Sequence, residues 1–99
     1  MGKITQPVFI SIQQEATGRR MRQLFQQKGY TVRDVQNAMG FENPQAIYKW
    51  LSGRSLPSID NLIVLSVILR VSIEEILVLD GDFCRYMGTL FLFCSRVFK

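Results

Sequence analysis

Signals that end a helix and signals that begin one alternate at short intervals along residues 15–79. Gly29, Gly40 and Gly53 each follow an apolar pattern with helical spacing, and glycine favours the left-handed conformation that ends a helix. The residues that suit the position just before a helix are Thr31, Asn43, Ser58 and Ser72. A region divided in this way is expected to form several short helices, which depend on tertiary packing because short helices are marginal alone.

The apolar spacing between these signals predicts five helices, at about 17–28, 32–39, 44–52, 59–69 and 73 to 77 or 78. Pro44 suits the first position of its helix, because its missing N–H would be unpaired there. The side chains that we expect the first three helices to turn inward are Met21, Leu24, Phe25, Val35, Ala38, Met39, Ile47, Trp50 and Leu51. The fourth helix is apolar almost all round, so we expect it at the centre of the core.

The two ends of the chain differ in composition from residues 14–79 between them. Residues 1–13 are rich in β-forming side chains and contain a proline, so we expect an extended arm or strand. Residues 80–99 are aromatic and apolar, and we expect strands at 84–86 and 89–94 that form a β-hairpin. This segment is expected either to supply a dimer contact, together with the N-terminal strand, or to cover the core of its own protomer.

The composition excludes several classes of function. The 99 residues suffice for one domain, and the absence of histidine excludes histidine-dependent zinc sites and catalytic triads. No nucleophile–base pair is evident, so we expect no enzymatic activity, cofactor, metal or small-molecule substrate. Asp80-Gly81-Asp82 has too few ligands for a calcium loop and is expected to be a turn. Without a targeting segment or an apolar run of about 20 residues, the chain is expected to be cytoplasmic, with Cys84 and Cys94 reduced and no membrane partner.

Positive charge is concentrated in the first part of the chain. Residues 1–56 hold eight basic and three acidic residues, a balance of +5, whereas residues 57–99 hold four basic and five acidic residues, a balance of −1. A basic half beside a nearly neutral half favours a polyanionic partner for the first. Scattered charges that only keep the domain in solution would give the same count.

Residues 32–39 and 44–52 are two short helices joined by a tight turn, which is the helix-turn-helix pattern. An ordered set of further residues surrounds it: Arg19–Leu24, Lys28–Thr31, Met39–Phe41, Gln45–Trp50, Gly53, Pro57-Ser58, Leu62 and Val71–Leu77. Over residues 17–79 this set resembles the Cro/phage-repressor (XRE-like) helix-turn-helix family. The resemblance implies a mainly α, five-helix, lambda-repressor-like domain that binds operator DNA, usually as a dimer. To this we add a small β element from the N- and C-terminal segments.

The first turn of the third helix is expected to enter the major groove, which is wide enough to admit a helix. Gln45 can form two hydrogen bonds with an adenine edge, and Lys49, one turn further on, suits guanine or a phosphate. The alternative is that this is simply a solvated helix face. Tyr48 flanks the face, and the resemblance implies contacts with the sugar-phosphate strand by other residues. The full set of expected DNA-binding residues is Thr31, Asn43, Pro44, Gln45, Tyr48, Lys49, Ser52, Arg54 and Ser55.

Four features depart from the family pattern, among them Val32 where glutamine is frequent and a segment 41–45 that is one residue longer than usual. Gln36 stands where a small residue is usual between the two helices, so its side chain must widen the crossing or turn outward. Arg70 stands in place of a frequent glycine, and a left-handed conformation there would cost about 1 kcal/mol.

We therefore expect a sequence-specific, DNA-binding transcriptional regulator that acts on double-stranded DNA as a homodimer, and as a repressor. The alternative is a protein-interaction module, antitoxin-like or an accessory subunit, that uses the aromatic segment at residues 80–99.

Overall fold

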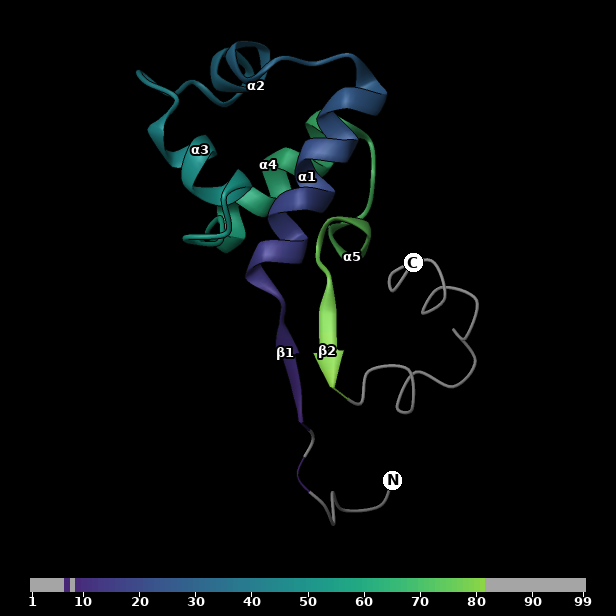
Figure 1. Ribbon diagram of the computed structural model, residues 1–99. Coiled ribbons are helices and arrows are strands. Elements are labelled where there is room, and N and C mark those ends of the chain that lie inside the picture. The colour runs from purple at the N-terminus through teal and green to yellow at the C-terminus, as the bar shows by residue number, and fades with distance from the viewer. Residues whose placement is uncertain (1–6, 8, 82–99) are drawn as a thin grey trace.

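Short helices and one short ribbon build the protein, as its stop and start signals predict. The computed structural model describes residue 7 and residues 9–81. Its helices are α1 (Gln14–Lys28), α2 (Val32–Met39), α3 (Gln45–Leu51), α4 (Ile59–Leu69) and α5 (Ile73–Ile76). Two strands, β1 (Ile10–Ile12) and β2 (Leu79–Gly81), form a ribbon that projects away from the helices (Figure 1). The expected mainly α fold with five helices and a small β element is confirmed, and none of the described helices has the length and hydrophobicity to cross a membrane.

Side-chain caps fix the starts of three helices. In α2 the Thr31 hydroxyl accepts from the Asp34 backbone N–H at 3.1 Å, and the Asp34 carboxylate accepts from the Thr31 N–H at 2.9 Å. Ser58 and Ser72 accept in the same way from backbone N–H groups three residues further on. These local hydrogen bonds satisfy N–H groups that a helix start leaves unpaired, and α2 and α4 have the predicted bounds.

Two predicted helix starts are wrong. Helix α1 begins at Gln14 rather than Thr17, without a side-chain cap. Helix α3 begins at Gln45, and Pro44 is its N-cap with φ −91° and ψ 8° rather than its first helical residue. The first helical hydrogen bond runs from the Tyr48 N–H to the Pro44 carbonyl at 3.1 Å, which makes Pro44 the cap. Asn43 still takes part as expected, because its Oδ1 accepts from the Gln45 N–H at 3.1 Å.

The core is built from one face of each helix. Its buried apolar side chains are Met21, Leu24, Phe25, Val35, Ile47, Trp50, Leu51, Leu62, Leu65, Leu69 and Ile76. Met39 packs against this cluster, but Ala38, predicted to face inward, is exposed. Helix α4 does not lie at the centre of the core as predicted, because Ile59, Ile63 and Val67 on its other face are exposed.

The N-terminal strand is confirmed at Ile10–Ile12, and its partner among the described residues is β2. Strand β1 pairs antiparallel with Leu79–Gly81, with Ile10 opposite Gly81 and Ile12 opposite Leu79. Asp80 and Gly81 therefore belong to a strand rather than to a turn. The strands expected at 84–86 and 89–94 lie outside the described residues.

Hydrogen bonds join the ribbon to the start of α1. The Gln13 backbone N–H donates to the Val78 carbonyl at 2.8 Å, and the Gln13 side-chain amide donates to Asp80 Oδ2 at 2.8 Å. The Val78 N–H donates to Oγ1 of Thr17, which is fully buried on α1, at 3.0 Å. The segment after α5 is therefore fixed to α1 through residues more than sixty positions apart in sequence.

Replacing Thr17 by valine is expected to destabilise the protein by about 1–3 kcal/mol, because the similar shape leaves the half-buried Val78 N–H without its acceptor. Chemical unfolding measures the loss, and hydrogen exchange at Val78 shows whether the ribbon is released. Thr17→Ser is the control, since it keeps the accepting oxygen. Equal stability of Thr17→Val and the wild type would contradict the prediction.

The departures from the family pattern at Gln36 and Arg70 are accommodated locally. Gln36 is half-buried, and its Nε2 donates to the Phe41 carbonyl at 3.3 Å, so the longer side chain supports the turn between α2 and α3. Arg70 ends α4 in the left-handed conformation, with φ 56° and ψ 43°.

Candidate nucleic-acid interface

Helix α3 divides into a buried face and an exposed polar face. Ile47, Trp50 and Leu51 are buried, as predicted, and Trp50 meets the Phe41 ring edge-on at 5.9 Å between centroids. Gln45 and Lys49 are exposed and stand one helical turn apart. The anchored side therefore holds α3 in place while its polar side faces the solvent.

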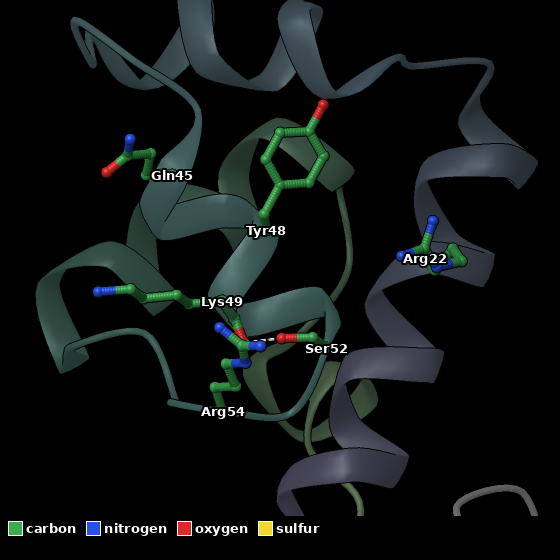
Figure 2. A pocket seen from close by; sticks show the side chains of 6 residues that line it. All are labelled: Arg22, Gln45, Tyr48, Lys49, Ser52 and Arg54. Carbon is green, nitrogen blue, oxygen red and sulfur yellow. Dashed lines mark hydrogen bonds between the residues drawn. The ribbon is translucent and has the colours of Figure 1, made fainter.

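The turn after α3 folds back on Lys49. The Lys49 carbonyl oxygen accepts from the Ser52 hydroxyl at 3.1 Å, from the Arg54 N–H at 3.0 Å and from the Ser55 N–H at 3.4 Å. These contacts return the chain toward the exposed face, and Arg54 comes to lie beside Lys49 (Figure 2). The backbone of a single residue thus brings two cations from different elements together.

Six side chains surround one open concavity of about 480 Å³: Arg22, Gln45, Tyr48, Lys49, Ser52 and Arg54. Figure 2 shows α3 on one side and Arg22 of α1 across from it. Three of the six are cationic and none is acidic, so the concavity favours an anionic ligand. Arg22 was not among the predicted site residues; it stands 23 positions before Gln45, and only the packing of α1 against α3 brings it here.

A second concavity of about 450 Å³ adjoins the first at Tyr48, whose side chain is 54% exposed and lines both. The other residues that line it are Val32, Arg33, Gln36, Asn37 and Pro44. Arg33 and Asn37 are exposed on α2 and were also missed by the sequence analysis. The polar surface therefore extends from α3 across to α2.

The remaining predicted site residues line neither concavity. Thr31 and Asn43 are exposed at the starts of α2 and α3, and Ser55 is half-buried beyond α3. Asn43 uses its carbonyl oxygen as a cap, which leaves its side-chain NH₂ to donate to a phosphate. Ser52 directs its hydroxyl proton at the Lys49 carbonyl, so the hydroxyl would have to rotate before it could donate to a phosphate.

The chain was compared with known proteins. A helix-turn-helix family model matches residues 21–76, and no curated protein is significantly similar to the chain. The restriction-modification controller protein C.AhdI from Aeromonas hydrophila is 21% identical, with a TM-score of 0.57 over 63% of this chain and 92% of that one. The clp gene regulator ClgR from C. glutamicum is also 21% identical, with a TM-score of 0.57 over 86% of this chain and 96% of that one.

Proposed function

Because the chain belongs to the helix-turn-helix family, we propose that it is a sequence-specific, DNA-binding transcriptional regulator. The family match confirms the resemblance predicted from the sequence, and the two solved structures have the same fold. The observation that carries the proposal is the cationic concavity in front of α3, which gathers Gln45, Lys49 and Arg54. A protein that reads base edges needs exposed hydrogen-bonding side chains on a helix, and it needs cations nearby that bind the phosphates of the duplex.

In this proposal each group of residues has its own task. Gln45 reads an adenine edge in the major groove, and Lys49 binds a guanine or a phosphate. Arg22, Arg54 and the side-chain amide of Asn43 bind the sugar-phosphate strand. Tyr48, Pro44, Thr31, Ser52 and Ser55 complete the expected contact surface.

The finer parts of the proposal concern how the protein acts. It acts in the cytoplasm as a homodimeric repressor, on a site with two half-sites about one helical turn of DNA apart. Its task is binding rather than catalysis, since three of the six side chains in front of α3 are cations and the Ser52 hydroxyl donates to a backbone carbonyl rather than to a base.

Selecting bound duplexes from a random pool at two salt concentrations tests this function. The wild type is expected to enrich one motif, and higher salt is expected to weaken all binding steeply, because phosphate contacts release counterions. If no motif were enriched at either salt concentration, the proposal of sequence-specific binding would be overturned.

Replacing Gln45 by alanine is expected to reduce discrimination at one base pair by about 1–3 kcal/mol, which is the value of a bidentate base contact. Binding to unrelated duplexes should stay the same, because the cations remain. Competition binding with the selected motif and its single-base variants measures the change. Gln27→Ala, on an exposed part of α1 outside both concavities, is the matched control. An equal loss on every duplex would show that Gln45 does not read a base.

A further inference from the structure

Helix α4 carries the largest group of exposed apolar side chains on any described element. Ile59 and Val67 are 74% and 71% exposed, and Ile63 and Val64 are 49% and 39% exposed. The opposite face of the same helix, with Leu62, Leu65 and Leu69, already fills the core. The exposed face is therefore surplus to the packing of the described domain, and contiguous apolar surface of this kind marks a contact with another surface.

These four residues, which we call the α4 stripe, form one apolar surface in which no hydroxyl lacks a partner. Ile59, Ile63 and Val67 are spaced four residues apart and so lie along one line of the helix, with Val64 beside it. The hydroxyl of Ser66, which is half-buried next to the stripe, donates to the Ile63 carbonyl of its own helix at 2.7 Å. Covering the stripe would thus leave no hydroxyl without a partner.

The two ends of the stripe carry opposite charges. Asp60 is exposed in the first turn of α4 and Arg70 is exposed at its C-cap. Within the described part of the chain, neither side chain has an ion-pair partner. Two copies of α4 aligned in parallel would bring like charges together, whereas an antiparallel pair would bring Asp60 of each copy toward Arg70 of the other.

We propose that the α4 stripe is the surface through which two copies of this chain pair, with their α4 helices antiparallel across a twofold axis near Ile63. Such a contact is isologous, since Ile59 of one copy meets Val67 of the other and the reverse. In this pair Asp60 of one copy lies opposite Ser66 of the other, four residues before that copy's Arg70. With a rise of about 1.5 Å per residue, Asp60 and Arg70 are then about 6 Å apart along the helix axis, within the reach of an arginine side chain. This inference rests on the proposed homodimeric function and identifies its interface.

The position of α4 connects this pairing to DNA. Ile59 follows Arg54 by only five residues, so the loop that carries Arg54 to the concavity leads directly into the stripe. Pairing through α4 would place the two loops on either side of the twofold axis, each beside its own α3. The dimer would then carry two copies of the cationic concavity, one for each half-site.

A charge exchange in the full-length protein tests the pairing. The wild type, with a chain mass of 11.4 kDa, is expected to sediment as a dimer. Asp60→Arg and Arg70→Asp should each raise the dimer dissociation constant at least tenfold, by placing like charges together. The double variant should return to within about threefold of the wild type, because the exchanged charges attract again. Glu74→Arg, the same charge change at an exposed position on α5, is the control and should leave the constant unchanged.

A change to the apolar surface tests the same interface independently. Ile63→Asp is expected to sediment as a monomer with an unchanged helical circular dichroism spectrum, and to bind a single half-site as the wild type does. A monomeric wild type, a dimer that survives Ile63→Asp, or a double charge exchange that fails to restore the dimer would each overturn the inference. Failure of the wild type to bind any duplex would instead overturn the proposed function, and the sedimentation result would still decide the interface.

Discussion

Replacing Gly18 by alanine is expected to lower the free energy of unfolding by about 1–3 kcal/mol, although alanine normally favours a helix by about 1 kcal/mol. Gly18 is buried on α1, and a Cβ there would lie 2.6 Å from the carbonyl oxygens of both Trp50 and Leu51. Both obstacles are backbone atoms at the end of α3, so no side chain can move aside to make room. Helix α3 itself would have to shift away from α1.

The same substitution is expected to weaken DNA binding by more than the unfolded fraction explains. The concavity lies between Arg22 on α1 and the polar face of α3, so a shift of one helix changes its width. Thermal unfolding measures the loss of stability, since the melting temperature of a domain of this size falls by about 4–8 °C for each kcal/mol. The affinity for the selected motif, measured well below the melting temperature, gives the change in DNA binding by the folded protein.

Gly29→Ala is the matched control for this prediction. Gly29 ends α1 with φ 75° and has no atom within 4 Å of a Cβ position, so alanine there meets only the cost of a left-handed conformation, about 1–2 kcal/mol. It is expected to lower stability without changing the affinity of the folded protein. Unchanged stability of Gly18→Ala, or equal effects of both variants on affinity, would show that the contact between α1 and α3 does not position the site.

The sequence predicts best where the physical cause of a structure is local. Thr31 and Ser58 have their hydrogen-bond partners three residues away, and the helices that they begin were predicted to the residue. Likewise, Gly29 and Gly40 end α1 and α2 in the left-handed conformation that the sequence signals. The helix-turn-helix could therefore be predicted from cap spacing and apolar periodicity, before any long-range contact was considered.

The predictions fail where the partner lies far along the chain. The start of α1 is set by Gln13, whose side chain and backbone bind Asp80 and Val78, and no local pattern indicates this. For the same reason β2 was taken for a turn, because a strand of three residues is recognisable only beside its partner. A helix that is apolar almost all round, such as α4, gives little indication of which face the core will leave exposed.

The same distinction applies to the candidate site. Gln45, Tyr48 and Lys49 could be chosen from the sequence because they share one face of one helix. Arg22 could not, because its place opposite α3 depends on the close approach of α1 at Gly18. A cation among several on a basic helix has no local feature that separates it from its neighbours. Its role therefore has to be tested directly.

Replacing Arg22 and Arg54 by glutamine together is expected to weaken binding to a single half-site duplex about 60-fold at 0.1 M salt. Each phosphate contact contributes about 0.9 to the slope of log affinity against log salt, which corresponds to about eightfold per contact at this concentration. The slope should fall by about 1.8 per protomer, and the base preference should persist because Gln45 is untouched. Fluorescence anisotropy over a salt series measures both quantities.

Single variants and one control separate this prediction from a general effect of charge. Arg22→Gln and Arg54→Gln should each lose about eightfold, since the two arginines belong to different elements and, in the proposed interface, contact different phosphates. Lys28→Gln removes one positive charge from an exposed part of α1 outside both concavities. It should change affinity by less than about twofold, because salt screens the attraction between a distant exposed charge and the DNA. If Lys28→Gln weakened binding as much as Arg22→Gln, net charge rather than the concavity would account for the affinity. An unchanged slope in Arg22→Gln would remove α1 from the interface and leave α3 and its following turn as the whole of the contact surface.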